Sequence, residues 1–236
     1  MDFPLLKAQG ANLRPIEQPK SLKQVAYEAL HRAIMAGELV QGKIYREKEL
    51  AAKLSISRTP VREALLELST KELVTFLPRK GIMIKQFNEN DWDEIFELRR
   101  ALEVAILEKV APKASREDIQ RMEAILHEQQ ACMDREDFLE FLHQDRLFHS
   151  YLSEKTDNIR MIRSYANIQD LIQLMGTYAL TAEGRTKGAL EEHQAIVAAI
   201  AAGDAEGARK AMVHHLEVSR KLALERYAWS RREHGG

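Results

Sequence analysis

The chain has 236 residues, and its 35 basic and 36 acidic side chains leave a formal net charge of −1. With 45% hydrophobic and 30% charged residues, the composition is typical of a soluble globular protein and excludes a disordered, collagen-like or coiled-coil chain. The longest apolar run, residues 195–202, is far shorter than the roughly 20 residues that cross a bilayer. A single cysteine, Cys132, excludes an intrachain disulfide and a cysteine-based zinc finger. No secretory signal is visible, so we expect a cytoplasmic protein that does not contact a membrane.

The charges and the prolines divide the chain into two parts. Residues 1–86 carry 15 basic against 9 acidic side chains, whereas residues 87–236 carry 20 against 27. Five of the six prolines lie in the first part and none follows Pro112, so long helices can continue from there to the end. A small basic domain before a larger, acidic and helical one indicates a polyanion-binding module joined to a second functional unit.

The first part predicts helices followed by a hairpin. Residues 1–20 contain three prolines without clear periodicity, so we expect a flexible arm. Apolar residues then recur at helical spacing from Leu22 to Gly37, a residue typical of helix ends. Two further helices and two β-rich runs are predicted at 47–54, 57–71, 74–77 and 82–87. This order is that of a winged helix-turn-helix domain, which we assign to residues 21–87.

The second part, residues 88–236, shows helical periodicity throughout and no strand pattern. Six helices are expected, at about 91–111, 115–134, 137–155, 158–181, 188–203 and 204–232. No repeat of 20–50 residues suggests a solenoid. The expected fold class is therefore mainly α, with an N-terminal winged helix-turn-helix followed by an all-α six-helix bundle.

One motif, residues 57–65, has the pattern of a DNA-reading helix. Arg58 and Arg62 are four residues apart and share one face near the predicted N-terminus of their helix. In a helix-turn-helix this end enters the major groove, where arginine can donate two hydrogen bonds to guanine. Other residues are placed to contact phosphates or a groove, namely Lys48, Ser57, Thr59, Arg79, Lys80 and Gly81.

The alternative is that Arg58 and Arg62 are solvated and paired with Glu63 or Glu67. An isolated arginine pair would favour that explanation, and the basic excess of the first part alone is weak evidence for DNA binding. Here the order of helices, the turn and the basic hairpin tip agree with one another. We therefore favour contact with double-stranded DNA.

Four potential metal ligands fall on inward-facing stripes of the predicted bundle. Asp145 and His149 are four residues apart on one apolar helical face, and an unpaired buried carboxylate there would be costly. His193 and His215 also lie on apolar stripes, whereas His214 falls among charged residues. One carboxylate and three imidazoles could bind a first-row divalent metal. Spacing alone favours the alternative of four unrelated, hydrogen-bonded side chains, because only Asp145 and His149 are local to each other.

Arg99 lies within the apolar stripe of the predicted 91–111 helix, whereas Arg100 falls with acidic residues and is expected to be solvated. An inward arginine can pair with Asp145 or another buried acid. It can also form a bidentate clamp for the carboxylate of a small ligand. The residues alone leave both roles open.

Residues 22–86 resemble the DNA-binding domain of the GntR family of bacterial transcriptional regulators. The resemblance is carried by Ile34-x-x-Gly37, Glu49-Leu50-Ala51, residues 57–65 and Arg79-Lys80-Gly81. It implies that operator DNA is contacted by Lys48, Arg58, Thr59, Arg62 and the glycine-containing wing tip. The chain departs from the pattern at Lys71-Glu72-Leu73, where the family often has a glycine.

Residues 91–225 resemble the all-helical FCD effector domain of the FadR-type branch of that family. The matching landmarks are Leu98-Arg99-x-x-Leu102-Glu103, Asp145-x-x-x-His149, Glu192-His193 and His215-Leu216. The resemblance implies a divalent metal on Asp145, His149, His193 and His215, with zinc expected first and nickel or manganese also compatible. It also implies a homodimer, and it favours the clamp role of Arg99.

Together these observations predict a transcriptional regulator, expected to be a repressor and not an enzyme. A small organic acid bound to the metal and Arg99, within residues 88–236, would control the affinity for operator DNA, and two half-sites would require the homodimer. One alternative is a metal-dependent hydrolase or lyase with an appended DNA-binding module; another is a regulator that senses the metal itself. No second catalytic group is identifiable near the predicted ligands, which argues against the enzyme.

Overall fold

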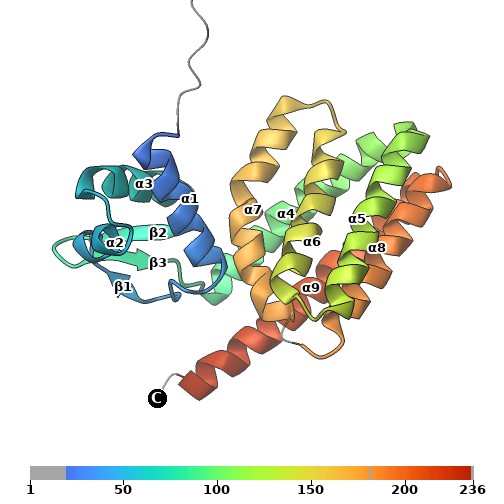
Figure 1. Cartoon of the computed structure of the whole chain (residues 1–236). Coiled ribbons are helices and arrows are strands. Elements are labelled where there is room, and N and C mark those ends of the chain that lie inside the picture. The colour runs from blue at the N-terminus through green and yellow to red at the C-terminus, as the bar shows by residue number, and fades with distance from the viewer. Residues whose placement is uncertain (1–19, 181, 235–236) are drawn as a thin grey trace, which may run out of the picture.

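The computed structural model describes residues 20–180 and 182–234, so the predicted arm at 1–20 lies, apart from Lys20, outside the described residues. The described part of the chain forms a small domain of helices and a sheet beside a larger bundle of helices (Figure 1). The expected fold class, a winged helix-turn-helix followed by an all-α bundle, is confirmed.

The small domain packs three helices against a short sheet. Its helices and strands are α1 (Leu22–Met35), β1 (Ile44–Tyr45), α2 (Glu47–Lys53), α3 (Arg58–Thr70), β2 (Val74–Leu77) and β3 (Gly81–Ile84). Ser21 caps α1 by accepting a hydrogen bond from the backbone N–H of Gln24. In α3 the buried residues Val61, Ala64, Leu65 and Leu68 recur at helical spacing, so this face packs on α1 and leaves the opposite face exposed.

The sheet has the antiparallel strand order β1-β3-β2. The β2–β3 hairpin confirms the predicted one, with Leu77 paired to Gly81 across the turn. β1 was not predicted, because a strand of two residues shows no alternation that could be recognised. The φ of +130° at Gly81 favours glycine, and a Cβ there would overlap the backbone carbonyl oxygen of Tyr45. Glycine at this position therefore lets the wing pack against β1.

The bundle contains the six predicted helices, with ends shifted by up to three residues. They are α4 (Glu89–Val110), α5 (Arg116–Asp134), α6 (Phe138–Glu154), α7 (Ile159–Leu180), α8 (Arg185–Ala201) and α9 (Ala205–His234), with a 3-10 turn at Ala111–Lys113. Capping boxes formed by Asn88 with Asp91 and by Ser115 with Asp118 start α4 and α5.

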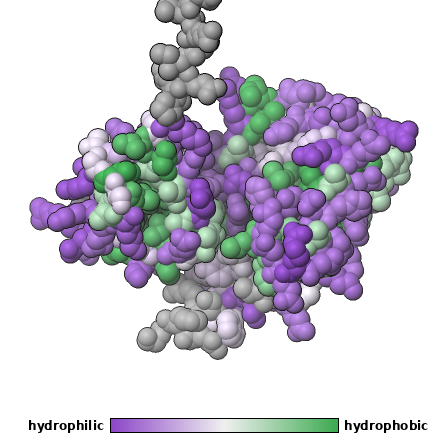
Figure 2. Space-filling model, in the orientation of Figure 1, coloured by the Kyte–Doolittle hydropathy of each residue, from purple (hydrophilic) through white to green (hydrophobic). Residues whose placement is uncertain are grey.

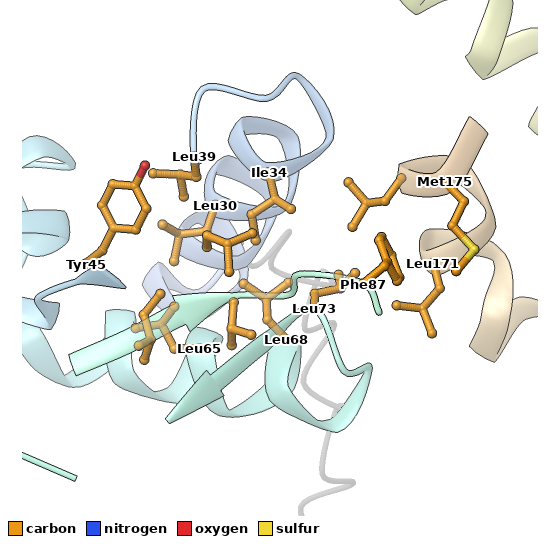
Figure 3. Close-up of a cluster of buried hydrophobic side chains, with 14 of the residues drawn as sticks. Leu30, Ile34, Leu39, Tyr45, Leu65, Leu68, Leu73, Phe87, Leu171 and Met175 are labelled. Carbon is orange, nitrogen blue, oxygen red and sulfur yellow. The ribbon is translucent and has the colours of Figure 1, made fainter. Parts of the chain in front are cut away.

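The two domains share a hydrophobic core. Phe87, Leu73 and Ile34 of the winged helix belong to the same buried cluster as Leu171 and Met175 of α7. Figure 3 shows Phe87 next to Leu171 and Met175 of α7, with Leu73 and Ile34 on the side of the winged helix. A second cluster fills the bundle itself, around Phe148, Ile196 and Met212. The winged-helix domain is therefore packed directly on α7 and is not joined to the bundle by a free linker alone.

The surface differs between the two domains. Figure 2 shows mainly hydrophilic side chains on the visible face of the bundle, while hydrophobic ones gather over the winged-helix domain. Leu22, Val25 and Leu66 of that domain are exposed. Among the described helices, none is both long and apolar enough to cross a membrane.

Candidate DNA-reading groove and metal centre

A groove on the winged helix lies between the start of α3 and the hairpin tip. It is lined by basic residues from three places in the sequence, namely Arg46, Lys48, Arg58, Arg62, Arg79 and Lys80, together with Gly81. α3 starts at Arg58, so Arg58 and Arg62 project from its first two turns beside the wing. The structure thus brings together the predicted reading residues of α3 and the wing tip.

The groove residues are available to a partner. The Arg58 side chain is 65% exposed, and its ion pair with Glu47 is long at 3.4 Å. Arg58 is thus paired with Glu47 and not with Glu63 or Glu67, the partners of the alternative explanation. Glu67 forms an ion pair with Lys23 instead. Exposed pairs of this kind contribute little to stability, so Arg58 can exchange Glu47 for another anion at small cost.

Ser57 and Thr59 lie beside the groove rather than in its lining. Ser57 occupies the N-cap position of α3 but its side chain makes no capping hydrogen bond, and both hydroxyl residues are exposed. Arg46, which precedes α2, was not predicted as a groove residue. Its place in the groove depends on how the segment before α2 folds against the wing, which the sequence does not show.

The four predicted metal ligands meet inside the bundle. Asp145 and His149 come from α6, His193 from α8 and His215 from α9. One ligand atom from each lies within 4.8 Å of all the others. The three histidines are buried, whereas the Asp145 side chain is 21% exposed. His214 is exposed on the other side of α9, as the sequence predicted.

Each histidine is oriented by a second polar residue. Nδ1 of His149 lies 2.5 Å from Oε2 of Glu103, and Nδ1 of His215 lies 2.7 Å from Oε2 of Glu192. Nδ1 of His193 lies 2.9 Å from Oε1 of Gln129. Because carboxylate and amide oxygens accept hydrogen bonds, each ring carries its proton on Nδ1 and turns the lone pair of Nε2 inward. Such partners fix the tautomer of metal-binding histidines.

The surroundings of His193 and His215 favour neutral rings. Burial, followed by the neighbouring imidazoles and arginines, lowers the pKa of both His193 and His215 well below the ordinary value. Their Nε2 atoms are buried and lack a hydrogen-bond partner. An unsatisfied buried polar atom is costly, and neutral imidazole is the form that binds metals. The donor set therefore fits a divalent ion.

Arg99 occupies the same interior. Its Nε donates to Oε1 of Glu103 at 2.6 Å, and its Nη2 lies 3.2 Å from Nε2 of His149. The buried ion pair anticipated as one role of Arg99 is thus present, with Glu103 rather than Asp145 as the bonded acid. Burial would raise the pKa of Glu103, but His149 and Arg99 outweigh it and hold that pKa below its usual range.

A small cavity of about 40 Å³ opens beside the cluster. Asp145, His149 and His215 form part of its wall. Three arginines from different helices also line it, namely Arg99, Arg146 and Arg185. Arg185 is held by two hydrogen bonds to Glu192, of 2.8 and 2.9 Å, and by one to Ser219. Each of these arginines is also paired with an acid, so an anion in the cavity would share their N–H donors.

Several of these residues were not predicted to take part in the site. Glu103 and Glu192 appeared only as motif landmarks, and Gln129, Arg146 and Arg185 were not singled out. Gln129 carried a usable signal, since it is a polar residue within the buried stripe of α5. The partners of Arg146 and Arg185 depend on contacts between helices, which spacing along one helix does not reveal.

These two sites have the features expected of a DNA-binding protein with a second, ligand-binding helical domain. An exposed basic groove on a winged helix suits a nucleic acid. A buried donor cluster beside an arginine-lined cavity suits a small ligand.

Comparison with known proteins places this class in one family. Residues 22–84 match the bacterial regulatory proteins of the gntR family, and residues 94–218 match the FCD domain. The chain therefore belongs to the GntR family of transcriptional regulators, in the group with a C-terminal FCD domain, and is not an enzyme.

Individual relatives agree with this assignment. The HTH-type transcriptional repressor RspR of Escherichia coli is 24% identical over 212 residues, covering 88% of this chain and 93% of RspR. The gluconate operon transcriptional repressor of Bacillus subtilis is 30% identical over 150 residues, covering 64% of this chain and 61% of that protein. The structure of E. coli McbR/YncC has the same fold, with a TM-score of 0.77 and 21% identity, covering 89% of this chain and all of that one.

Proposed function

We propose that the chain is a transcriptional repressor whose affinity for operator DNA is controlled by a small organic acid bound beside a divalent metal in the helical domain. The observation that carries the proposal is the convergence of Asp145 and three buried histidines on one point, beside an arginine-lined cavity whose wall includes Asp145, His149 and His215. The names of relatives, two of which are repressors, support the direction of control.

On the DNA side, Arg58 and Arg62 would read base edges in the major groove. The other contacts would position the protein on phosphates or at the groove edge, through Lys48, Ser57, Thr59, Arg79, Lys80 and Gly81. The exposed basic lining of the groove supports this arrangement. A homodimer, with residues 88–236 forming the dimer interface, would place two winged-helix domains on two half-sites.

On the sensing side, Asp145, His149, His193 and His215 would hold the metal, with zinc favoured and nickel or manganese compatible with mixed nitrogen and oxygen ligands. A bound ion with open positions would supply Lewis-acid sites for the oxygens of a carboxylate. Arg99 would clamp the same carboxylate, but only by sharing the guanidinium that now bonds Glu103.

The size of the cavity has a consequence for the ligand. At about 10–15 Å³ for each water, a volume near 40 Å³ holds only a few waters. An acid larger than acetate therefore has to displace side chains from the cavity wall. Binding and rearrangement of the bundle are then linked, as a regulator requires.

The test uses duplex DNA selected from a random library by the full-length protein. Affinity is measured by fluorescence anisotropy with metal-free protein, with zinc-loaded protein, and with zinc-loaded protein plus acetate, citrate or D-gluconate. We expect one carboxylate to weaken binding at least about tenfold, which is about 1.4 kcal/mol, and only when zinc is present. In Arg99→Lys, which keeps a cation beside Glu103 but loses the planar fork, that response should shrink.

Two other results would change the conclusion. If zinc alone alters affinity and no acid adds to the change, the metal itself is the effector. If neither zinc nor any acid of the panel changes the affinity, the proposed control by the helical domain is wrong.

A further inference from the structure

Asp170 of α7 connects the cavity wall with the reading domain. Its side chain is only 1% exposed, and three basic residues, from α1, α6 and the end of α3, contact it. Arg146 of α6 lies 2.5 Å from Oδ1, His31 of α1 lies 3.1 Å from Oδ1, and Lys71 lies 3.1 Å from Oδ2. One buried carboxylate thus has partners in both domains.

The partners have different neighbours. Arg146 lines the cavity and also donates to Oε1 of Gln173, another cavity residue, at 2.9 Å. Lys71 is the C-cap residue of α3, the helix that carries Arg58 and Arg62. Two ion pairs, Arg146–Asp170 and Asp170–Lys71, therefore connect the cavity wall with the end of the recognition helix.

The helix that carries Asp170, α7, contacts the winged helix with one face and the cavity with another. Leu171 and Met175 pack in the hydrophobic cluster shared with the winged helix, as Figure 3 shows. Ile172 and Gly176 line the cavity. In Figure 1, α7 lies on the side of the bundle that faces α1. Movement of the cavity wall cannot leave this domain contact unaffected, because one rigid helix forms part of both.

Asp170 needs its partners to remain a buried anion. Burial would raise the pKa of its carboxyl, but the hydrogen bonds and charges of His31 and Arg146 outweigh burial and keep that pKa below its usual range. Removal of one partner from a buried ion pair leaves a desolvated charge that is poorly compensated. Without Arg146, only His31 and Lys71 would compensate the buried carboxylate, so keeping it buried between the domains would cost more, and separation of the domains, which would expose Asp170 to water, would relieve that cost.

We propose that Asp170 is the positioning residue through which Arg146, at the cavity wall, determines how firmly the recognition helix is held against the bundle. This inference rests on the proposed function, because an organic acid in the cavity would be the anion that competes with Asp170 for Arg146. When Arg146 turns to such an anion, Asp170 loses a cation and the winged helix is released from α7.

The experiment measures hydrogen–deuterium exchange of the full-length protein without DNA or acid. Asp170→Asn should speed amide exchange about tenfold in the last turns of α1 and α3, residues 30–35 and 66–70. Arg146→Gln should speed exchange in the same segments, and Arg146→Lys should largely restore protection. Zinc content and exchange in α5 and α8 should stay unchanged, which separates release of the domain from general unfolding.

A double variant provides the decisive comparison. If Arg146 acts through Asp170, Arg146→Gln should add less than about twofold to the exchange rates when Asp170→Asn is already present. Lys155→Gln, which breaks the 2.6 Å ion pair with Asp118 elsewhere in the bundle, serves as the matched control and should leave α1 and α3 unchanged. Full additivity of the two changes, or unchanged exchange in Asp170→Asn, would overturn the proposal without affecting the proposed control by metal and acid.

Discussion

The candidate DNA-reading groove and the histidine cluster hold their polar side chains in opposite ways. In the groove, Arg58 is 65% exposed and has one long ion pair. In the cluster, the side chains of His193 and His215 are at most 1% exposed, and a hydrogen bond from Nδ1 fixes each ring. The groove is therefore adaptable, whereas the cluster is preorganised.

This difference follows from what each site would bind. DNA supplies phosphates and base edges along a large surface, so the energy is spread over many exposed contacts that salt can screen. A metal ion requires a few donors at fixed positions, so orienting partners matter as much as the donors. Single substitutions should accordingly cost more in the cluster than in the groove.

The largest effect is expected for a direct ligand. His215→Ala should lower zinc affinity more than about 100-fold, because a donor is lost and Glu192 loses its Nδ1 partner. Chelation should lower the melting temperature of the wild type, since a bound ion stabilises only the folded state. Metal content by elemental analysis and thermal unfolding with and without EDTA provide the measurements.

His214→Ala is the matched control, because this neighbouring residue is exposed on α9. It should retain zinc and its chelator-dependent melting shift. Loss of zinc in His214→Ala with retention in His215→Ala would show that the proposed ligand set is wrong.

A smaller effect is expected for an orienting residue. Gln129→Leu keeps the volume of a fully buried side chain but removes the acceptor for Nδ1 of His193, so zinc affinity should fall about 10- to 100-fold with little loss of stability. Competition with a fluorescent zinc chelator measures the change. Gln130→Leu, one residue further along α5, breaks only an exposed bond to Asp134 and should bind zinc normally. Equal affinities in both variants would mean that the ring of His193 does not need Gln129.

The sequence predicted the elements well wherever the signal was local. Pro60 near the start of α3 and the turn at 78–81 mark boundaries that depend on a few neighbouring residues. The stripes of the bundle helices correctly turned His215 inward and His214 outward, because helical periodicity alone decides which of two adjacent residues faces the core.

What the sequence did not reveal depends on packing between distant segments. The partner of Arg99 is Glu103, one helical turn away. The spacing of the two residues allows this pair, but it does not show which of the nearby acids is buried beside Arg99. The contacts of Asp170 to His31 and Lys71 join segments about 100 or more residues apart, and no periodic pattern encodes them. The docking of the winged helix on α7 belongs to the same class of unpredicted features.

In the groove, individual base contacts are expected to matter moderately. Arg58→Ala or Arg62→Ala should each cost about 1–3 kcal/mol of operator affinity and relax discrimination at the base pair that is read. Both side chains are exposed, so folding should be unaffected, which circular dichroism can verify. Glu63→Ala, an exposed change in the same turn, is the control. Operator affinity that is unchanged in both arginine variants would exclude α3 as the recognition helix.

The smallest effect is expected at the wing tip. It should differ from the effects at α3 because it should not depend on the DNA sequence. Lys80 is exposed between Arg79 and Gly81, and a lysine there suits a phosphate rather than a base. Lys80→Ala should weaken selected and unrelated duplexes by a similar factor. It should also reduce the slope of log affinity against log salt by about 0.9, the value for one released counterion. Anisotropy titrations at several salt concentrations, with both kinds of duplex, measure the two quantities together. A loss confined to the selected duplex, with the salt slope intact, would instead assign Lys80 to base reading and extend the specific part of the groove from α3 to the wing.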